Sequence, residues 1–560
     1  MVFISDKIVK ALVSLQEEGS IPFFTLPQII ITRPNDEKFG DYTSNIALVI
    51  SRQADRSPKE IADFLKNKLE GDFAKVEVAG PGHLNFYLPS TYFQDVVESF
   101  DKDSFSEEDG ETIMVEYSQP NTHKEFHIGH LRNVFIGSTL VNILRKTGKK
   151  VIAANYIGDT GTHIAKCLWG IQTFHREVDL DALENKAEFL GQVYTEATQK
   201  IEENPDYEEQ FKALQNRFEA GEPDLVSLWK KTKEWSMEEF QSLYQELGVV
   251  FDEYFYESLE EEAGKKLLPE LLEKGIVKES EGAIIADLEQ YNLGILVLVR
   301  KDGSALYGLK DIPLAKKKFE EYQIDKSIYV VDIRQEFYFK QLFKILELYG
   351  FHKNMIHYGY EFVALKGGET MSSRKGNIIA ARTLIKSVEE KVMEQFPDSP
   401  DIQAIALGAI RFAMLKHSAG SKIEFEIEES VRLDGSTGPY VQYAHARIAS
   451  ILDKAIEEGL AINESSVFGE ELHQKEKELI REISKFPEIL EEIANSGEVH
   501  KISHYSLKVA ERFHSFYSQC KVIDRDNPLL SQQRLKIIRA TQKVLAESLS
   551  LMGIAAPEKM

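Results

Sequence analysis

The chain is poor in cysteine, in positive charge and in long apolar runs. Its 560 residues include only two cysteines, Cys167 and Cys520, far apart, which excludes a disulfide framework and a cysteine-rich zinc site. Acidic residues outnumber basic ones, 91 to 67, which argues against a general nucleic-acid binder. A local basic face or a cationic small substrate stays compatible with that charge.

No apolar run reaches the ~20 residues that a membrane-spanning helix needs. The N-terminus lacks a basic segment followed by an apolar one, so we expect no secretory signal. We therefore expect a cytoplasmic protein without a membrane anchor. The length favours three or four domains.

The most informative stretch runs from Thr112 to Gly148. Residues 112–118 are apolar and predict a buried strand, and Pro120 ends it because proline cannot extend a ladder. A helical pattern follows His127-Ile128-Gly129-His130, with apolar residues at three- and four-residue steps up to a glycine stop. Two histidines therefore flank a glycine where a strand gives way to a helix.

That position favours an anion site. The first turn of a helix has unpaired N–H groups and a partial positive charge. Gly129 lets a ligand approach the backbone, and the two imidazoles can donate hydrogen bonds to phosphate oxygens. The alternative is one buried and one exposed histidine with no ligand. The strand, the breaker, Lys124 and the basic first turn with Arg132 together favour the functional interpretation.

The rest of the chain falls into recognisable segments. Residues 1–105 resemble a separate α/β module, with a helix-start signature at Ser57-Pro58-Lys59-Glu60. Further buried strands are predicted at 151–157, 327–331 and 361–365, and an acidic, helix-rich insertion over about 170–290. A hairpin is predicted around Lys301-Asp302-Gly303, followed by a helix that opens at Lys310-Asp311. From about residue 400 the pattern is helical.

Three further loops and helices carry candidate contacts. Gly158-Asp159-Thr160-Gly161 follows a predicted parallel strand, where either a plain turn or a site wall fits. The glycine-rich loop after Lys366, with Arg374 and Lys375, would attract phosphates if it lies near the histidines.

Residues 501–560 carry ten basic and five acidic side chains interleaved with aromatic residues. We expect nucleic-acid contacts from Lys508, Arg512, Lys521 and Arg525, because phosphates favour cations and bases stack on aromatic rings. The alternative is an amphipathic bundle whose aromatic side chains form its core.

Together these motifs resemble class I aminoacyl-tRNA synthetases, and among them the arginyl-tRNA synthetase family. His127-Ile128-Gly129-His130 resembles the class I signature that holds ATP, and Met371-Ser372-Ser373-Arg374-Lys375 resembles its second signature. Residues 116–121, 158–162, 438–447 and 39–42 are similar to stretches specific to the arginine enzyme.

The resemblance implies an α/β fold in three parts. A Rossmann-like catalytic domain with the helical insertion spans 106–400, an N-terminal α/β module that touches the tRNA elbow spans 1–105, and an all-α helical bundle that reads the anticodon spans 401–560. The implied substrates are L-arginine, ATP with Mg²⁺ neutralising its phosphates, and the tRNA for arginine. The implied reaction is attack of the arginine carboxylate on the α-phosphate, followed by transfer to the terminal ribose of the tRNA. The family's habit is a monomer.

Matching positions carry implied roles. The implied arginine pocket consists of Glu116, Asn121, Tyr307, Asp311 and Gln335. The implied ATP site consists of His127, Gly129, His130, Asn133 and Met371. His127 and His130, with Lys124 and Lys375, are the catalytic candidates, and Tyr440 and Arg447 are further tRNA candidates. No protein-bound metal site is implied.

Two departures from the family pattern are visible. Thr370 and Ser373 stand where the common second signature has lysines, so the lysine credited with neutralising pyrophosphate is absent. Lys124 is the first candidate to replace it, and Lys375 or Arg374 the weaker one. Tyr338 stands where the family more often has histidine.

Two other classes of function remain as alternatives. A nucleotidyltransferase could share the paired histidines and act without RNA, although the large insertion and the basic C-terminal region speak against it. A non-catalytic RNA-binding paralogue is disfavoured by the intact His127, Gly129, His130, Glu116 and Asp311.

Overall fold

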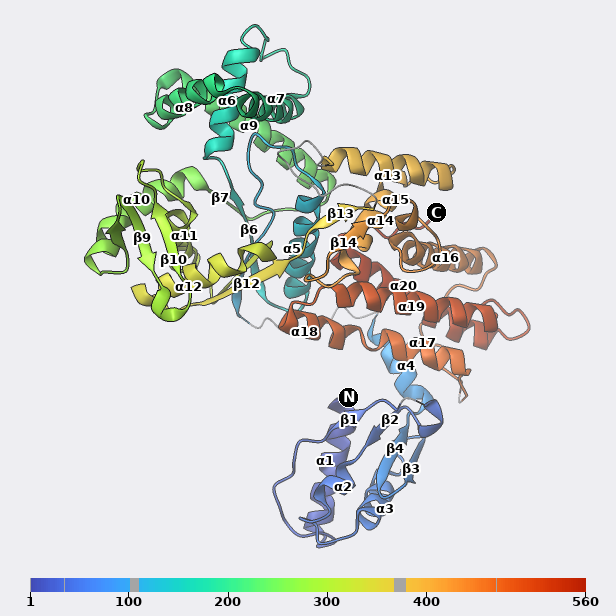
Figure 1. Ribbon diagram of the computed structural model, residues 1–560. Helices are drawn as coiled ribbons and strands as arrows, with labels where there is room; N and C mark the ends of the chain where they lie inside the picture. Colours follow the sequence, from blue (N-terminus) through green and yellow to red (C-terminus); the bar gives the residue numbers. More distant parts are fainter. Residues whose placement is uncertain (1, 35, 101–109, 367–378, 470) are drawn as a thin grey trace. The chain divides into compact units, whose positions relative to one another are not determined.

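The structure is a computed structural model that describes residues 2–34, 36–100, 110–366, 379–469 and 471–560 (Figure 1). The chain divides into two compact units. Unit 1 comprises residues 1–102, 455–484 and 515–540, and unit 2 comprises residues 103–454, 485–514 and 541–560. The predicted boundaries at 105 and 400 stay predictions.

Unit 1 is built on a four-stranded antiparallel sheet in the order β1-β2-β4-β3. The predicted helix start at Ser57 is confirmed, since its hydroxyl accepts from the Glu60 N–H and the Glu60 carboxylate accepts from the Ser57 N–H. The elements of this part are α1 (Val2–Glu17), β1 (Ile31–Thr32), η1 (Glu37–Phe39), β2 (Tyr42–Ser44), α2 (Ile46–Ile50), α3 (Pro58–Leu69), β3 (Lys75–Ala79), β4 (His83–Tyr87) and α4 (Ser90–Ser99).

Two segments of the C-terminal region belong to the same unit. Helix α17 (Gln474–Ile483) packs on α4. The buried carboxylate of Asp41 pairs with Arg481, and the Arg33 guanidinium donates to the Arg481 carbonyl at 3.0 Å. The Phe468 N–H donates to the Gln94 side chain at 3.0 Å. The N-terminal sheet is therefore tied to residues more than 370 positions away in the sequence.

Unit 2 contains a five-stranded parallel sheet in the order β12-β11-β5-β6-β7. Its strands are β5 (Thr112–Glu116), β6 (Lys150–Ile157), β7 (Glu253–Tyr256), β11 (Lys326–Asp332) and β12 (Asn354–Tyr360). Every residue of β5 is buried, which explains its uninterrupted apolar character. The strands predicted at 112–118, 151–157 and 327–331 are thereby confirmed, as is the Rossmann-like fold class.

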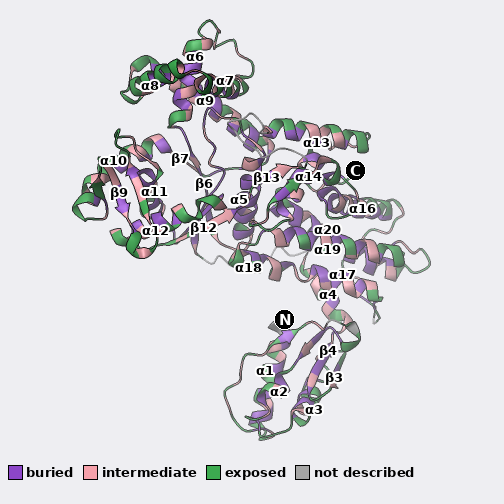
Figure 2. Cartoon of the chain, in the orientation of Figure 1, coloured by how far each residue is buried: buried purple, intermediate pink, exposed green. Residues whose placement is uncertain are grey.

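Helix α5 (Ile128–Lys146) follows β5 and is buried along most of its length (Figure 2). It ends as predicted, since Gly148 has a φ of 83° just beyond the C-cap residue Thr147. A helix buried on nearly all faces holds its N-terminus in a fixed place, which matters for the histidines there.

The insertion over 170–290 is not helical throughout. Helices α6 (Thr162–Phe174), α7 (Lys186–Glu203), α8 (Pro205–Glu219) and α9 (Pro223–Glu246) fill it up to Glu246. The chain then forms β7 of the main sheet, α10 (Glu257–Glu273), β8 (Lys278–Ser280) and β9 (Ala283–Asp287). These strands were missed within the helix-rich interval of 170–290 because they are short, with three to five residues each.

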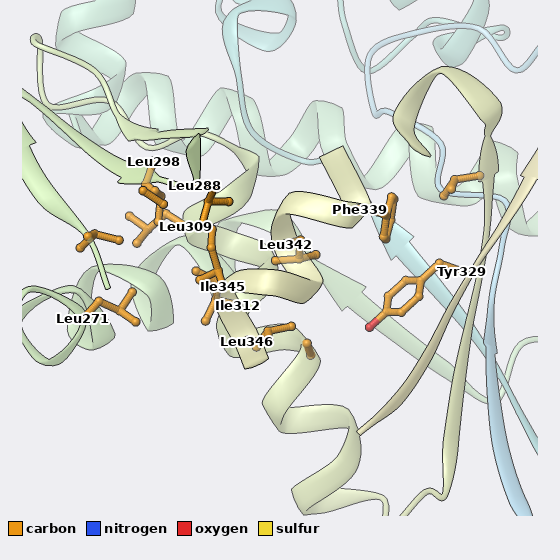
Figure 3. Packing of buried hydrophobic residues seen from close by; sticks show 14 residues of the cluster. Leu271, Leu288, Leu298, Leu309, Ile312, Tyr329, Phe339, Leu342, Ile345 and Leu346 are labelled. Carbon is orange, nitrogen blue, oxygen red and sulfur yellow. The ribbon is translucent and has the colours of Figure 1, made fainter. Parts of the chain in front are cut away.

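The predicted hairpin is confirmed at its turn, although residues 305–307 do not form a strand. After η2 (Glu289–Tyr291), strand β10 (Ile295–Val299) pairs with β9. Beyond the turn, Ala305 bridges back to Val299 and the Leu306 N–H donates to the Leu298 carbonyl at 2.8 Å. Helix α11 (Tyr307–Glu321) begins at Tyr307, three residues before the predicted start. Leu309 and Ile312 of α11 pack with residues of α10, β10 and α12 (Glu336–Tyr349) in one apolar cluster (Figure 3). This cluster fixes the helix that carries Tyr307 and Asp311.

The strand predicted at 361–365 is shorter than expected. Strand β13 (Val363–Leu365) pairs with β14 (Ile423–Phe425), which lies in a region predicted to be helical, while the edge strand of the main sheet is β12. The remaining elements are η3 (Ile333–Gln335), α13 (Ala381–Gln395), α14 (Ile402–Leu415), α15 (Ile427–Ser430), α16 (Gly438–Glu457), α18 (Phe486–Ser496), α19 (His500–Gln519) and α20 (Pro528–Leu551). The C-terminal region is otherwise helical, as predicted.

Candidate active site at the carboxyl ends of the parallel strands

His127 and His130 form a reciprocal cap at the start of α5. The Gly129 N–H donates to Nδ1 of His127 at 3.1 Å, and the His127 N–H donates to Nδ1 of His130 at 3.1 Å. The two rings stack with centroids 3.7 Å apart. Because each Nδ1 accepts a backbone hydrogen bond, the ring proton of a neutral imidazole sits on Nε2. Both Nε2–H groups are therefore available as donors.

The imidazoles are neutral near pH 7. Burial, followed by the nearby charge of Lys124, lowers the pKa of His127 to about 4. Burial, the neighbouring imidazole and Lys124 hold the pKa of His130 well below its ordinary value. Lys124 Nζ also lies 5.3 Å from the centre of the Tyr194 ring. The structure thus brings the predicted Lys124 within electrostatic reach of both histidines.

Gly129 sits against the His127 ring. A Cβ at this position would lie 3.1 Å from ring atoms of His127. Any side chain there would push the imidazole from its place. The glycine therefore keeps both the ring orientation and the backbone approach that the sequence predicted.

Two residues of the α5 first turns are occupied by structural contacts. The buried guanidinium of Arg132 donates to the carbonyls of Glu361 at 2.5 Å and Ser418 at 3.1 Å, so it does not present a charge to an anion. The Asn133 amide accepts from the Ser118 N–H at 2.5 Å and donates to the Val330 carbonyl at 2.8 Å. Asn133 therefore joins β5 to β11, and its predicted contact with ATP stays a prediction.

Asp311 has one occupied and one open carboxylate oxygen. The Tyr338 hydroxyl donates to Oδ2 at 2.5 Å, while Oδ1 is buried and has no hydrogen-bond partner among the described residues. Burial, with the charges of Glu116 and Glu257 adding to it, raises the pKa of Asp311 to about 7 against the lowering effect of the Tyr338 hydrogen bond. An unpaired buried acceptor is costly, which points to a cationic or hydrogen-bonding ligand.

Glu116 is already paired. Its Oε2 lies 2.5 Å from Nζ of Lys318, and its Oε1 accepts from the Gln119 side chain at 2.9 Å. Both members of the ion pair are almost fully buried, and the ammonium also lies 4.2 Å from the centre of the Tyr329 ring. Glu116, predicted as an arginine ligand, is thus the counter-charge of the buried Lys318. The sequence could not show this pairing, because Lys318 is one of three consecutive lysines in α11.

Two of the other predicted pocket residues follow strands of the parallel sheet. Asn121 bridges to Gly158 in the loop after β5, and Gln335 is exposed in η3 after β11. Tyr307, one turn before Asp311, is exposed at the start of α11. Tyr156 near the end of β6 was missed as a pocket residue. Its hydroxyl is buried without a partner in the described chain, and burial, followed by the charge of Asp311, raises its pKa.

The loop after β6 is held by structural contacts. The buried carboxylate of Asp159 accepts from Lys233 at 2.6 Å and from the Ser258 hydroxyl at 2.7 Å. Thr160 donates to Glu257 at 3.0 Å and accepts from Lys310 at 2.7 Å. These contacts hold the loop in place, and both interpretations, a plain turn and a site wall, stay predictions.

The second signature, with Met371, Arg374 and Lys375, lies outside the described residues. Across the ranges that the structure describes, no group of three or more histidine, cysteine, aspartate or glutamate side chains could hold a metal ion. In the same ranges, no helix is both long and apolar enough to span a membrane.

The C-terminal candidates are partly paired with acids. Lys508 lies 3.7 Å from Glu511 in α19. In unit 1, Lys521 lies 3.1 Å from Asp524, and Arg525 lies 3.1 Å from Glu458. The Tyr440 ring lies 5.2 Å from that of His514. Arg447 and Arg512 also lie in unit 2.

The aromatic side chains between those cations are mostly core. Tyr505, Phe513 and Phe516 are buried, while Tyr517 stays exposed. Stacking of RNA bases on the buried rings is therefore ruled out in this state. These three residues therefore follow the alternative interpretation, in which the aromatic side chains form the core of an amphipathic bundle.

Comparison with known families now gives the class. The family described as "tRNA synthetases class I (R), catalytic domain" matches residues 94–426, which contain the parallel sheet and the histidine pair. This part of the chain is the catalytic domain of a class I aminoacyl-tRNA synthetase. "Arginyl tRNA synthetase N terminal domain" matches residues 3–88, and "DALR anticodon binding domain" matches residues 441–560. The chain belongs to the arginyl-tRNA synthetase family.

Whole-length relatives agree with this assignment. An arginine–tRNA ligase of Bdellovibrio bacteriovorus is 33% identical, with 95% of this chain and 94% of that protein covered. One of Clostridium botulinum is 32% identical, with 95% and 96% covered. The arginyl-tRNA synthetase structure of Thermus thermophilus has a TM-score of 0.77 at 26% identity, covering 100% of this chain and 99% of that one. A methionyl-tRNA synthetase of Mycobacterium tuberculosis shares the fold alone, with a TM-score of 0.53 at 12% identity over 80% of this chain and 92% of that one.

Proposed function

We propose that this chain is an arginine–tRNA ligase, which activates L-arginine with ATP and transfers it to the 3′ end of its tRNA. Membership of the family over the whole chain supports the reaction. The observation that carries the choice of amino acid is the buried, unpaired Oδ1 of Asp311. A guanidinium offers planar N–H donors with a positive charge, which is the complement of such an oxygen.

The first step joins arginine to the α-phosphate. A carboxylate oxygen of arginine attacks the α-phosphorus of ATP, the bond to the bridging oxygen of the β-phosphate breaks, and pyrophosphate leaves. The Nε2–H groups of His127 and His130 donate to phosphate oxygens as negative charge accumulates on them. Neutral imidazoles suit this task, because each already carries the Nε2 proton that it donates to a phosphate oxygen and needs no second proton from solvent.

The arginine pocket that we propose surrounds Asp311. Asn121, Tyr307 and Gln335 complete it, with Glu116 acting in its paired form. Lys124 takes the place of the missing lysine of the second signature, and its electrostatic effect on both histidines supports this role. In the second step a hydroxyl of the terminal ribose attacks the arginyl carbonyl carbon, and AMP leaves.

Mg²⁺ enters this proposal as part of the nucleotide substrate. Mg²⁺ keeps several waters and binds mainly through substrate phosphates. The described residues offer no cluster that would cage it, so the fit is to a counter-ion carried by ATP.

The basic residues Lys508, Arg512, Lys521 and Arg525, with Tyr440 and Arg447, are proposed tRNA contacts. We also propose that the protein is a cytoplasmic monomer, which light scattering after gel filtration would test for its mass.

Aminoacylation of total tRNA with each of the twenty amino acids in turn tests the function. We expect charging with arginine alone, and ATP–pyrophosphate exchange that depends on arginine and tRNA. Charging with another amino acid would overturn the pocket assignment. Nucleotide transfer without RNA would favour a nucleotidyltransferase. A His130→Ala variant that binds tRNA but no longer charges it excludes a non-catalytic RNA-binding protein.

A further inference from the structure

The loop between β5 and α5 has an unusual backbone. Ser118, Gln119 and His123 have φ values of 76°, 49° and 63°, a region that residues with a side chain rarely adopt. The loop contains Asn121 and leads into Lys124. Its conformation is unfavourable on its own, so neighbouring elements must hold it.

One face of helix α9 supplies the contacts. The Tyr244 hydroxyl lies 2.6 Å from Oγ of Ser118, the Ser236 hydroxyl accepts from the His123 N–H at 2.9 Å, and Thr232 Oγ1 lies 2.8 Å from Nε2 of His123. The three α9 residues are spaced by four and eight positions, so they lie on the same side of the helix. Each contacts a residue with a positive φ.

The contact between Thr232 and His123 is fully buried. The Thr232 hydroxyl donates to the Leu228 carbonyl at 2.8 Å, and Nδ1 on the other side of the His123 ring lies 3.0 Å from Oγ1 of Thr122, so the ring is held through both of its nitrogens. Burial lowers the pKa of His123 to about 3, which keeps the ring neutral and the hydrogen bond intact at physiological pH.

The C-terminal half of the same helix contacts a second segment near the histidines, at residues 380–382. Arg382 donates to Glu239 at 2.6 Å, to Glu246 at 2.6 Å and to Ser242 at 2.9 Å. Ala380, two residues earlier, bridges to His127. Helix α9 thus contacts both the strained loop and the segment that runs beside the first histidine.

We propose that α9 is a positioning element for amino-acid activation, and that Thr232, Ser236 and Tyr244 are positioning residues that hold the Ser118–His123 loop in its binding conformation. None of the three is offered as a ligand of the substrates. The inference deepens the proposed function and rests on it, because it concerns how Asn121 and Lys124 are presented to arginine and ATP.

Two readouts on the full-length protein test the inference. Thr232→Val, Ser236→Ala and Tyr244→Phe each remove one hydroxyl. We expect each to raise the KM for arginine about tenfold with a smaller change in kcat, as for loss of one buried hydrogen bond. Amide hydrogen exchange of a peptide covering residues 118–126 should become faster in the same variants without any substrate. Thr232→Ser keeps the hydroxyl and should restore both readouts.

Ser227→Ala is the matched control, since Ser227 is an exposed serine on the same helix. Its KM and exchange should equal those of the wild type. A lower melting temperature with unchanged KM and unchanged exchange in the loop would overturn the inference, because that result describes a merely structural role. If the wild type fails to charge tRNA with arginine, the proposed function fails, while the exchange measurement still decides whether α9 holds the loop.

Discussion

The hydroxyl of Tyr338 donates to Oδ2 of Asp311 at 2.5 Å, and this single contact leaves Oδ1 as the open face of the carboxylate. The two residues come from different helices, α12 and α11, which one apolar cluster packs together (Figure 3). The tyrosine therefore sets the direction in which Asp311 can receive a cation.

Replacing Tyr338 with phenylalanine should weaken arginine binding. The change removes the donor to Oδ2 and frees the carboxylate to rotate, so we expect the KM for arginine to rise about tenfold or more, the effect of one hydrogen bond to a charged group. Steady-state aminoacylation gives KM and kcat separately. Tyr349→Phe, on the same helix and bonded to Glu270, is the matched control. Equal arginine KM values for the two variants would contradict the role of Tyr338.

Arginine binding should strengthen as the pH rises from 6 to 8. The pKa of Asp311 is raised to about 7, so the free protein holds a largely protonated carboxyl at pH 6, whereas a guanidinium requires the ionised form. We expect the KM for arginine to fall about tenfold over this range and to flatten above it. Burial lowers the pKa of His127 to about 4 and holds the pKa of His130 well below its ordinary value, so neither histidine titrates in this window. Asp311→Asn should bind arginine weakly at every pH, and a wild-type profile as flat as that of the variant would contradict the assignment.

The same shift predicts how stability depends on pH. The folded-state pKa lies above the ordinary aspartate pKa of 3.8, so the folded chain binds more protons than the unfolded one between the two values. The stability that this group contributes is present below pH 3.8 and is lost as the pH rises through about 7. Urea unfolding at several pH values measures the free energy of unfolding of the wild type and of Asp311→Asn. As the pH rises, the wild type should lose stability relative to the variant.

Substituting His127 with asparagine should separate capping from catalysis. Asparagine can cap the helix through its side-chain oxygen but lacks the Nε2–H donor. We expect kcat for aminoacylation to fall about 10²–10³-fold, the effect of losing a positioned transition-state donor. The melting temperature should stay close to that of the wild type. His127→Ala loses the cap as well and should also cost about 1 kcal/mol of stability. A fully active His127→Asn variant would mean that the ring acts only as a cap.

The pair Glu116–Lys318 should be needed for stability as well as for arginine binding. Glu116→Gln leaves a buried ammonium without its counter-charge and should cost about 3–5 kcal/mol in urea unfolding. The double variant Glu116→Gln, Lys318→Met removes both charges and should recover most of that loss. The KM for arginine then decides the role of Glu116. A double variant that is stable but binds arginine poorly supports a direct effect of the carboxylate, whereas normal binding would restrict Glu116 to holding Lys318.

Local patterns in the sequence determined the elements that recur with a clear period. Residues 112–118 predicted β5 because every side chain of that strand is buried, and the histidine motif predicted the start of α5 because caps and glycines act within a few residues. The short strands β7 and β8 could not be found in this way. They depend on neighbours in a sheet, and a period cannot be seen over three or four residues.

The sequence by itself determined the family, the parallel-sheet fold and the place of the histidine pair. Only the tertiary structure decided which polar groups are free to meet a ligand. Lys318 pairs with a glutamate 202 positions away, Arg132 is used by carbonyls more than 220 positions away, and the aromatic residues Phe513 and Phe516 fill a core. Such partners are chosen by packing between distant segments, because the cost of burying a charge or a donor is met by whatever group the fold brings to it.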